Sequence, residues 1–395
     1  MKNFNTRRLI IILFPISFTL MHFTLFRIFG FEFTALFVSL NILAISSIMN
    51  LRLKYKDIFL VSFLFFLPFI NILTRDFDLI DFIRSLLLYI NTILIVVILK
   101  NKIFSSRDYH RLFNLIINFG IIASVFLIVQ VIHTNVTDSK LLYYPFKTFT
   151  FFGGSRDFYY DTSNFLGVRR GNGFFIEPSV AGWFNCVIFT IILTLPDLRI
   201  KLKKIKLFIV FAGIISSLSA SAFVNLIAIL TLYYMNKIKY LSNKLLSIPV
   251  FVISIYLAFY YLGVIERLKQ ITVLGSSTYY RFMAPYKLLL NVLKESIFGM
   301  PFGSSDSINN SYYLLSYSFG VIGIILCSLF ILYSIYAALS NKEGSIFLFL
   351  MVLILAGTGS TYTPEIGAII LIYYWQIGYL KYHYSKSGLL ISPRG

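Results

Sequence analysis

The chain has little charge for its length and is especially poor in acidic residues. Only 13% of its 395 residues are Asp, Glu, Lys or Arg, whereas 58% are hydrophobic and 18% are aromatic. A soluble domain carries about 25% charged residues, so this sequence could not cover the surface of a water-soluble globule. The composition therefore excludes an ordinary soluble enzyme. Because the apolar stretches are continuous rather than alternating, it predicts an all-α integral membrane protein and not a β-barrel.

Cysteine and histidine are also scarce. Cys186 and Cys327 both fall inside predicted spans, which excludes a disulfide framework and a cysteine metal site. The 4 histidines are scattered, without an H-E-x-x-H pattern. The sequence also lacks a G-x-x-x-x-G-K-[ST] motif, which excludes a P-loop ATPase. We therefore expect a protein that needs no metal and no cofactor.

Twelve hydrophobic runs predict a single transmembrane domain over residues 1–395. Spans of about 20 residues fit at 9–27, 30–49, 58–73, 79–99, 112–132, 174–195, 206–218, 220–236, 246–264, 314–337, 346–360 and 366–380. The start, MKNFNTRRLIIILFPISF, has the charged-then-apolar pattern of a signal peptide. No small-residue cleavage site follows it, so we expect a retained first span.

The net charge of +19 could indicate a nucleic-acid binder, but its distribution favours another explanation. With the N-terminus inside, most of the 35 basic residues and few of the 16 acidic residues fall on the short inner loops. An excess of Lys and Arg on short cytoplasmic loops orients membrane proteins. The sequence therefore predicts a multi-pass protein of the lipid bilayer with both termini in the cytoplasm and no nucleic-acid partner.

Two predicted outer loops, residues 133–173 and 266–313, are much longer than the others. Long connections in a compact protein are usually functional or disordered, and these two are rich in tyrosine, phenylalanine and glycine. The aromatic residues would either form an interfacial belt or stack on sugar rings. We expect the function at this outer face, which is the periplasmic face in a cell with two membranes.

The first segment of interest is RRGNGFFIEPSVAG, residues 169–182. Its two arginines flank the outer end of a span, against the charge bias of the chain. Gly171 and Gly173 would let the backbone approach a ligand closely. Pro178 suits the first turn of a helix, which places Glu177 at or near the N-cap. This carboxylate is either a functional group at the rim of the bundle or a plain helix cap.

The second segment is SSTYYRFMAPYKLLLNVLKESIFGMPFG, residues 276–303. Its apolar residues after Arg281 predict an amphipathic helix that lies on the membrane surface or caps the site. Arginine presents a planar fork of donors that matches phosphate oxygens. Arg170 and Arg281, on separate outer loops, would therefore suit a bound lipid pyrophosphate.

These segments resemble motifs of the O-antigen ligase/polymerase superfamily, most closely the Wzy-type polymerases of O-antigen, capsule and colanic-acid-like polysaccharides. The family's arginine, glycine–aromatic step and proline-started helix resembles residues 169–182. Its serine-rich turn resembles residues 218–222, and its arginine, amphipathic helix and G-x-x-x-G pattern resembles residues 281–303. The resemblance covers roughly residues 170–325.

Two departures separate this chain from the ligases. The stretch NNSYY, residues 309–313, followed by Gly320 and Gly323, resembles the ligase motif H-N-x-[YF]-L…G-x-x-G, with Asn309 where ligases have histidine. The serine-rich turn has Ala222 where ligases usually carry a nearby arginine. The asparagine at position 309 favours a polymerase over a ligase.

The resemblance implies a C-type glycosyltransferase architecture in the bacterial inner membrane and a metal-independent reaction. Its substrates would be polyprenyl-pyrophosphate-linked oligosaccharide repeat units, and a chain-length regulator protein is a further implied partner. Arg170 and Arg281 would stabilise the leaving group, and Glu177 would accept the proton of the acceptor hydroxyl. The expected substrate-binding residues are Arg169, Arg84, Tyr279, Tyr280, Asn309, Asn310, Tyr313 and Glu365.

Several alternatives stay open at this stage. Asp76 and Asp78 imitate the D-x-D pattern of metal-dependent glycosyltransferases, but they also suit a plain outer loop. Arg84 either pairs with Asp81 three residues before it or lines the path of the lipid phosphate. Glu365, beside a proline, is a second outer carboxylate or a simple helix cap.

The function also has alternatives. An O-antigen ligase of the same superfamily would share the motifs, and a flippase or other transporter of lipid-linked oligosaccharides would share the hydropathy. Transporters, however, tend to place functional charges at the bilayer midplane on broken helices. This chain concentrates its remaining charges in the two long outer loops, which favours the polymerase.

Overall fold

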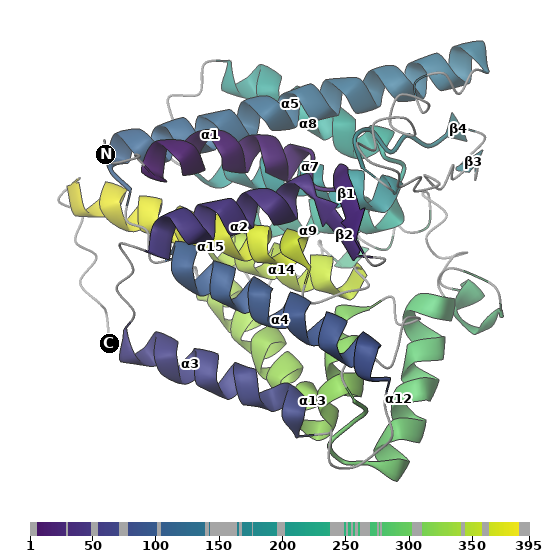
Figure 1. The fold of residues 1–395 in the computed structure, drawn as a ribbon. Coiled ribbons are helices and arrows are strands. Elements are labelled where there is room, and N and C mark those ends of the chain that lie inside the picture. The colour runs from purple at the N-terminus through teal and green to yellow at the C-terminus, as the bar shows by residue number, and fades with distance from the viewer. Residues whose placement is uncertain are drawn as a thin grey trace. The chain divides into compact units, whose positions relative to one another are not determined.

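The computed structural model describes residues 6–28, 31–48, 54–70, 78–100, 104–138, 164–165, 168–175, 177–195, 202–237, 269–274, 279–301, 310–340, 344–357 and 363–386, with isolated residues at 142, 249, 252–253, 256, 260 and 276. They are mostly helical, as the composition predicts (Figure 1). The chain divides into two compact units. Unit 1 comprises Met1–Leu51, Lys102–Leu226 and Leu371–Gly395, and unit 2 comprises Arg52–Asn101 and Ile227–Ile370.

Among the described residues, unit 1 contains five complete helices, two β-hairpins and parts of two further helices. Its elements are α1 (Thr6–Thr19), β1 (Thr24–Ile28), β2 (Phe31–Thr34), α2 (Ala35–Ile48), α5 (Ser106–Thr137), β3 (Asn164–Phe165), β4 (Val168–Arg169), α7 (Pro178–Thr194) and α8 (Lys203–Ser216). Two helices cross the boundary between the units: α9 (Ala220–Lys237) and α15 (Pro364–Lys386).

The helix α5 organises unit 1, since α1, α7 and α8 all pack against it (Figure 1). Small residues allow the close approach. A Cβ atom on Gly120 would lie 2.6 Å from Cγ1 of Ile188 in α7, and one on Gly213 of α8 would lie 2.9 Å from Cβ of Ser124. Ser124 Oγ also donates to Asn185 Oδ1 at 2.9 Å. Small residues and buried hydrogen bonds are the usual means by which helices associate in a membrane.

The first predicted span is shorter than expected. Its helix ends at Thr19, and Thr24–Ile28 forms a strand that pairs antiparallel with Phe31–Thr34. The rings of Phe26 and Phe33 stack across the hairpin with their centroids 4.6 Å apart. Two runs of β-branched and aromatic residues separated by two residues favour a hairpin. The hydropathy of these strands is similar to that of the helices beside them, so hydropathy alone did not predict the hairpin.

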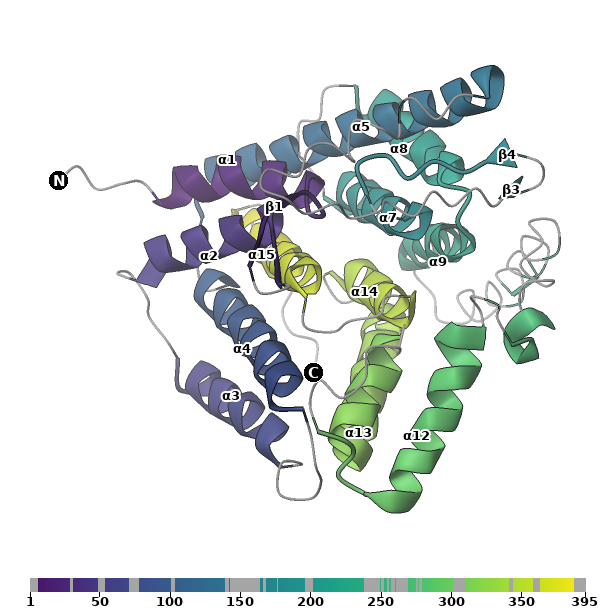
Figure 2. The same ribbon diagram turned by 45° about the vertical axis from the view of Figure 1, so that its right-hand side comes forward.

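Unit 2 consists of helices around a separate apolar core. Its elements are α3 (Tyr55–Phe66), η1 (Leu67–Phe69), α4 (Leu79–Lys100), η3 (Gln270–Thr272), η4 (Tyr279–Met283), α12 (Ala284–Glu295), α13 (Ser311–Leu339) and α14 (Ser345–Gly357). Phe82 and Tyr89 of α4 meet Val292 of α12 and Phe319 of α13 in this core. α12 runs alongside α13 (Figure 2).

A break at Gly320 divides α13 into two arms. Gly320 has φ 55° and ψ −134°, which is not helical, and the arms fold back on each other. A Cβ atom on Gly323 would lie 2.3 Å from the carbonyl oxygen of Leu315, and Cys327 Sγ lies 3.9 Å from the carbonyl oxygen of Tyr312. The span predicted at 314–337 is therefore not one straight helix.

By length and composition, three described helices could cross a membrane: α4, α5 and α13. The shorter helices α2, α7 and α14 are apolar as well. The other predicted spans overlap described helices, except that the span predicted at 246–264 lies almost entirely outside the described residues. The chain is a membrane-embedded protein. The twelve crossings and the single domain over residues 1–395 stay predictions.

Candidate functional site

One glutamine side chain of α5 fixes the arginine–glycine segment that follows β4. Gln130 is fully buried. Its Oε1 atom accepts hydrogen bonds from the backbone amides of Asn172 at 2.9 Å and Gly173 at 2.8 Å. Its Nε2 atom donates to Asn172 Oδ1 at 3.1 Å. Because buried polar groups require hydrogen-bond partners, these contacts fix the backbone two residues after Arg170, whose own side chain is half-buried.

The preceding residue is fixed to the last turn of α5. The Arg169 amide donates to Asn135 Oδ1 at 2.8 Å, and Asn135 Nδ2 donates to the Arg169 carbonyl oxygen at 3.0 Å. The Arg169 guanidinium forms an ion pair with Asp138, the residue that ends α5. Arg169 thus has an acidic partner within the protein, and its predicted contact with substrate stays a prediction.

The two glycines of the segment have different roles: Gly171 allows close packing on α5, and Gly173 allows a left-handed backbone conformation. A Cβ atom on Gly171 would lie 2.6 Å from Val131 Cγ2 and 2.8 Å from Leu127 Cδ1. Gly173 has φ +59°, a left-handed conformation that side chains disfavour. The close approach that we expected toward a ligand is, in the structure, an approach to the side chains of α5.

The two phenylalanines after the glycines pack residues 169–175 against aromatic rings of α5 and α7. The Phe174 ring stacks on Phe126 of α5 at 4.6 Å between centroids. The Phe175 ring is buried and lies 4.7 Å from that of Phe184 in α7. The segment therefore has a fixed apolar base, and the aromatic step of the motif has a packing role.

Glu177 stands at the start of α7, as the sequence predicts. Pro178 is the first residue of the helix, and Glu177 is its N-cap with φ −138° and ψ 149°. Its side chain makes no capping hydrogen bond. Instead the exposed carboxylate accepts a hydrogen bond from Ser179 Oγ at 2.9 Å. The side chain is thus not acting as a plain cap, and the role of general base stays open to it.

The serine-rich turn between α8 and α9 lies against the same helix. A Cβ atom on Gly182 of α7 would lie 2.4 Å from Ala222 Cβ and 3.0 Å from Ser217 Oγ. Ser219 Oγ and Ser221 Oγ are 2.9 Å apart. The fold therefore brings residues 169–182 and 218–222 together. A side chain as large as arginine would not fit at position 222 as α7 is now packed.

In unit 2, Arg281 lies in the π-helical turn Tyr279–Met283, which continues into α12. The Tyr279 amide donates to Ser276 Oγ at 3.0 Å, and its ring is buried. The Tyr280 ring is 45% exposed and meets that of Tyr279 edge to face at 5.6 Å. π-Helical turns occur frequently at functional sites, and this one presents Arg281 half-buried next to an accessible tyrosine.

The predicted amphipathic helix is present as α12, with Pro285, Leu289 and Val292 buried. The loop after it is seated in the break of α13. The Met300 amide donates to the Tyr317 carbonyl oxygen at 2.8 Å, and a Cβ atom on Gly299 would lie 2.5 Å from that same oxygen. The G-x-x-x-G stretch therefore contacts the broken helix directly, backbone against backbone.

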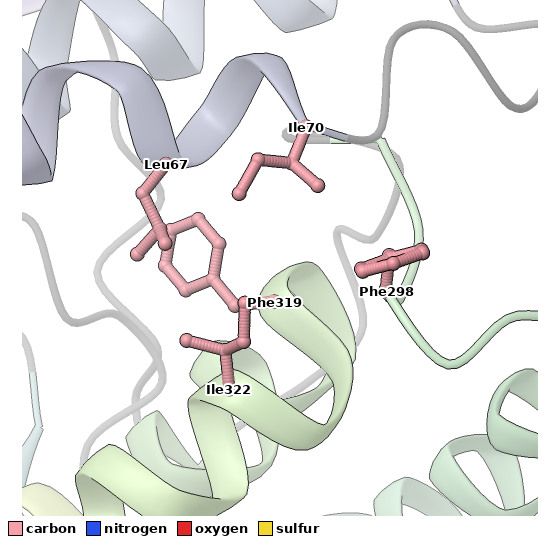
Figure 3. A pocket seen from close by; sticks show the side chains of 5 residues that line it. All are labelled: Leu67, Ile70, Phe298, Phe319 and Ile322. Atoms are coloured by element: carbon pink, nitrogen blue, oxygen red, sulfur yellow. The ribbon is translucent and has the colours of Figure 1, made fainter.

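A small apolar crevice lies beside this contact. Figure 3 shows its lining side chains, which converge from η1, from the loop after α12 and from α13. They are Leu67, Ile70, Phe298, Phe319 and Ile322. All are hydrocarbon side chains, and none of them is a predicted site residue.

The start of α13 uses Asn310 as a helix cap. Its Oδ1 atom accepts hydrogen bonds from the amides of Tyr312 at 3.0 Å and Tyr313 at 3.4 Å, and its Nδ2 atom donates to the Ala356 carbonyl oxygen at 2.9 Å. Asn310 is buried, so the structure shows it linking α13 to α14. Substrate contacts of Asn310 and Tyr313 stay predictions, and Asn309 lies outside the described residues.

The start of α4 shows the local contacts of Arg84 and Asp78. Arg84 forms the expected ion pair with Asp81, at 3.8 Å and with both side chains nearly half exposed. Asp78 Oδ1 accepts from the Ile80 amide at 2.8 Å and from the Asp81 amide at 3.2 Å, so it caps the helix. Asp76 lies outside the described residues. A binding role for Arg84 stays a prediction.

Glu365 lies in the first turn of α15, directly after Pro364, which agrees with the predicted helix start. The next turn packs on α4, since a Cβ atom on Gly367 would lie 3.2 Å from Thr92 Cγ2. Glu365 is half-buried. Its part in substrate binding stays a prediction.

Sequence reasoning did not identify Gln130 and Asn135. Gln130 lies within the span predicted at 112–132, where an amide is costly unless it has hydrogen-bond partners, whereas Asn135 lies in the predicted outer loop 133–173. That rule was the available signal for Gln130. Among the described residues, no group of three or more His, Cys, Asp or Glu side chains could hold a metal ion.

The predicted residues thus fall into two sets. Arg169, Arg170 and Glu177 lie with the serine-rich turn in unit 1, whereas Arg84, Tyr279, Tyr280, Arg281, Asn310, Tyr313 and Glu365 belong to unit 2. That Arg170 and Arg281 share one ligand stays a prediction.

Comparison with known proteins identifies the family. No curated protein and no solved structure matches this chain. The family model described as WcaD colanic acid polymerase matches residues 9–379 and so includes both sets of predicted residues. That range also includes nearly all described helices, in agreement with the resemblance to Wzy-type polysaccharide polymerases. The chain therefore belongs to the WcaD colanic acid polymerase family.

Proposed function

We propose that this protein joins polyprenyl-pyrophosphate-linked oligosaccharide repeat units into a bacterial surface polysaccharide. The family supports a polysaccharide polymerase. The observation that carries the finer proposal is the segment after β4, where hydrogen bonds from α5 fix the backbone next to Arg170 and an exposed carboxylate, Glu177, follows at the start of α7. A cationic side chain on an anchored backbone and an accessible carboxylate on the same segment suit glycosyl transfer from an anionic leaving group.

The proposed reaction is a direct displacement. The acceptor hydroxyl oxygen attacks the anomeric carbon of the donor, the bond from that carbon to the pyrophosphate oxygen breaks, and the lipid pyrophosphate leaves. Glu177 takes the hydroxyl proton. Arg170 and Arg281 stabilise the charge that develops on the pyrophosphate. Attack opposite the leaving group inverts the anomeric configuration, and the reaction requires no metal and no nucleotide sugar.

We further propose that the site faces outward from the cytoplasmic membrane, into the periplasm where a second membrane exists. The bias of Lys and Arg to the loops opposite the site supports this orientation, with both termini in the cytoplasm. The partners would be the bilayer, the lipid-linked substrates and a chain-length regulator protein. The surface polymer would be O-antigen, capsule or a colanic-acid-like polysaccharide.

One observation weighs against a transporter. A broken helix in a transporter typically binds the substrate or coupling ion with charges or helix ends near the bilayer midplane. α13 is broken at Gly320, yet its sequence from Ser311 to Leu339 contains no charged residue. The loop after α12 is already hydrogen-bonded to the break. The break therefore has a structural explanation.

The experiment uses a deletion strain complemented with wild-type protein, Arg281→Ala or Arg281→Lys. We expect the wild-type protein to restore a polysaccharide ladder, and Arg281→Ala to leave single repeat units on the outer face with the protein still inserted. Arg281→Lys should recover little, because lysine lacks the bidentate fork. Gly357→Ala serves as the inserted control, since nothing lies within 4 Å of a Cβ atom there.

Other outcomes separate the alternatives. Lipid-linked units left on the cytoplasmic face of the deletion strain would indicate a flippase, and loss of every repeat from the acceptor would indicate a ligase. Near-normal ladders with Arg281→Ala would remove this arginine from the catalytic set.

A further inference from the structure

We infer that Gln130 of α5 is a positioning residue for the proposed polymerisation, because it fixes the backbone that connects Arg170 to Glu177. The inference rests on the proposed function and deepens it. Gln130 itself touches no reacting atom in this arrangement. It acts through the amides of Asn172 and Gly173.

The first step of the argument is the position of the amide. Gln130 lies inside α5, an apolar helix long enough to cross a membrane. Burying an amide in such a helix is unfavourable unless its polar atoms are hydrogen-bonded. Its Oε1 atom accepts two backbone N–H groups, and its Nε2 atom donates to Asn172 Oδ1 at 3.1 Å. Three of its contacts thus go to one short segment of the chain.

The second step is what those contacts control. Asn172 and Gly173 are buried, so a hydrocarbon at position 130 would leave two buried amides without their acceptor. The backbone continues in a turn in which the Phe175 amide donates to the Asn172 carbonyl oxygen at 3.0 Å. A shift at residues 172–173 would therefore also move Arg170, two residues before Asn172, and Glu177, two residues after Phe175.

The third step is the size of the effect. Misplacement of a reacting group by about 1 Å lowers a rate by about 10²-fold. Aromatic packing holds the segment independently, because Phe174 stacks on Phe126 and Phe175 on Phe184. We therefore expect loss of the Gln130 contacts to misplace the segment without unfolding it.

The chain offers a matched control in Gln376 of α15. This glutamine is also fully buried in unit 1, and its Nε2 atom donates to Thr194 Oγ1 at 2.8 Å. Thr194 is the last residue of α7, whereas Glu177 directly precedes the first. Gln376→Met therefore removes an equally buried side-chain amide of α15. That amide contacts the C-terminal end of α7, whereas Glu177 lies at the N-terminal end of α7.

The experiment compares purified wild-type protein, Gln130→Met, Gln130→Glu and Gln376→Met. Turnover and KM are measured with a polyprenyl-pyrophosphate-linked repeat unit, and trypsin cleavage after Arg169 or Arg170 is measured by mass spectrometry. We expect Gln130→Met to lower kcat by about 10- to 100-fold with KM changed less than about threefold, and to accelerate cleavage. Gln376→Met should keep kcat within about twofold. Gln130→Glu should recover part of the activity, since its carboxylate can accept the same two amides.

Each contrary outcome overturns a distinct statement. The inference would be refuted if Gln130→Met had the kcat and the cleavage rate of the wild type. It would also be refuted if Gln130→Met and Gln376→Met lost activity equally and in proportion to their loss of thermal stability. If Gln130→Met does not insert, Gln130→Asn replaces it, because the shorter side chain stays polar but withdraws the acceptor from the Asn172 and Gly173 amides. Unchanged kcat and cleavage in that variant would again refute the inference. A wild-type protein that does not polymerise would refute the proposed function, while the cleavage comparison still tests the anchoring by Gln130.

Discussion

The two candidate segments are held in place by different chemistry. In unit 1, side-chain amides of Gln130 and Asn135 hydrogen-bond the backbone of residues 169–173. In unit 2, the loop after α12 contacts the broken helix α13 backbone to backbone, with glycines at both sides of the contact. A side chain can move aside by rotation about its bonds when a neighbouring residue is enlarged. Backbone atoms packed against a glycine cannot move aside in this way. We expect the first segment to tolerate small changes and the second to tolerate almost none.

The largest expected effect concerns activity in unit 1. Glu177→Gln keeps the shape of the side chain and its hydrogen bond with Ser179 but removes its basicity. General-base catalysis contributes about 10²–10⁴-fold to a rate, so the purified variant should make almost no polymer while still binding the lipid-linked substrate.

Polymerisation and substrate binding are both measured on the same preparation, with Ser179→Ala as the control that removes only the partner of the carboxylate. A rate near that of the wild type in Glu177→Gln would place the base elsewhere. Glu365 and Asp161, the latter outside the described residues, would be the next candidates.

The largest expected effect on stability lies in unit 2. Gly320→Ala would place a Cβ atom 2.0 Å from the Ile297 carbonyl oxygen, at a residue with φ +55°. The combination of φ 55° and ψ −134° is essentially confined to glycine and costs another residue about 1–3 kcal/mol. The added Cβ atom would also meet backbone, which cannot move aside as a side chain can. We expect little inserted protein and a clearly lowered melting temperature in detergent.

The matched control is Gly357→Ala in α14, where a Cβ atom meets nothing within 4 Å. Alanine there should leave stability unchanged or raise it by about 0.4–1 kcal/mol. Equal melting temperatures for the two alanine variants would show that the α13 break does not require glycine.

A smaller effect is expected from the corresponding glycine of unit 1. Gly171→Ala places a Cβ atom 2.6 Å from Val131 Cγ2 and 2.8 Å from Leu127 Cδ1, both ends of side chains. These can move, so we expect a destabilisation of about 1–3 kcal/mol, typical of overpacking. Adding Val131→Ala should restore part of it, which a double-mutant cycle of melting temperatures measures. Strict additivity of the two changes would contradict the contact.

The smallest effect is expected at the edge of the same segment. Asp138→Asn removes the charge from the ion pair with Arg169, in which the Asp138 side chain is 82% exposed. Exposed pairs contribute about 0–1 kcal/mol, and asparagine tolerates the left-handed φ of this position. Stability should fall slightly at low salt, and the difference from wild type should vanish at high salt. A large loss that salt does not reduce would assign Asp138 a role beyond charge pairing.

Part of the candidate site could be predicted from local rules. Pro178 starts a helix because its ring favours the first turn, and this places Glu177 at the N-cap in the structure as in the sequence. Arg84 pairs with Asp81 because residues three apart on a helix are neighbours. The amphipathic helix after Arg281 follows from the spacing of its leucines and valine.

Other features could not be predicted because they join residues far apart in the chain. Gln130 meets Asn172 across 42 positions, and no local pattern records that partner. The same holds for Gly171, whose missing side chain accommodates α5 and not a ligand. The hairpin after α1 was concealed because hydropathy does not distinguish an apolar strand from the end of an apolar helix.

By itself, the sequence determined the class of the protein and the approximate positions of its helices, since apolar composition and helical length are properties of each segment alone. It also indicated the family through short motifs. Only the tertiary structure decided what those motifs do locally: a cap at Asn310, a break at Gly320 and a backbone anchored by Gln130. The physical reason is that the role of a buried polar side chain or of a glycine depends on the group that it contacts. That group is distant in the sequence and is determined by the tertiary fold.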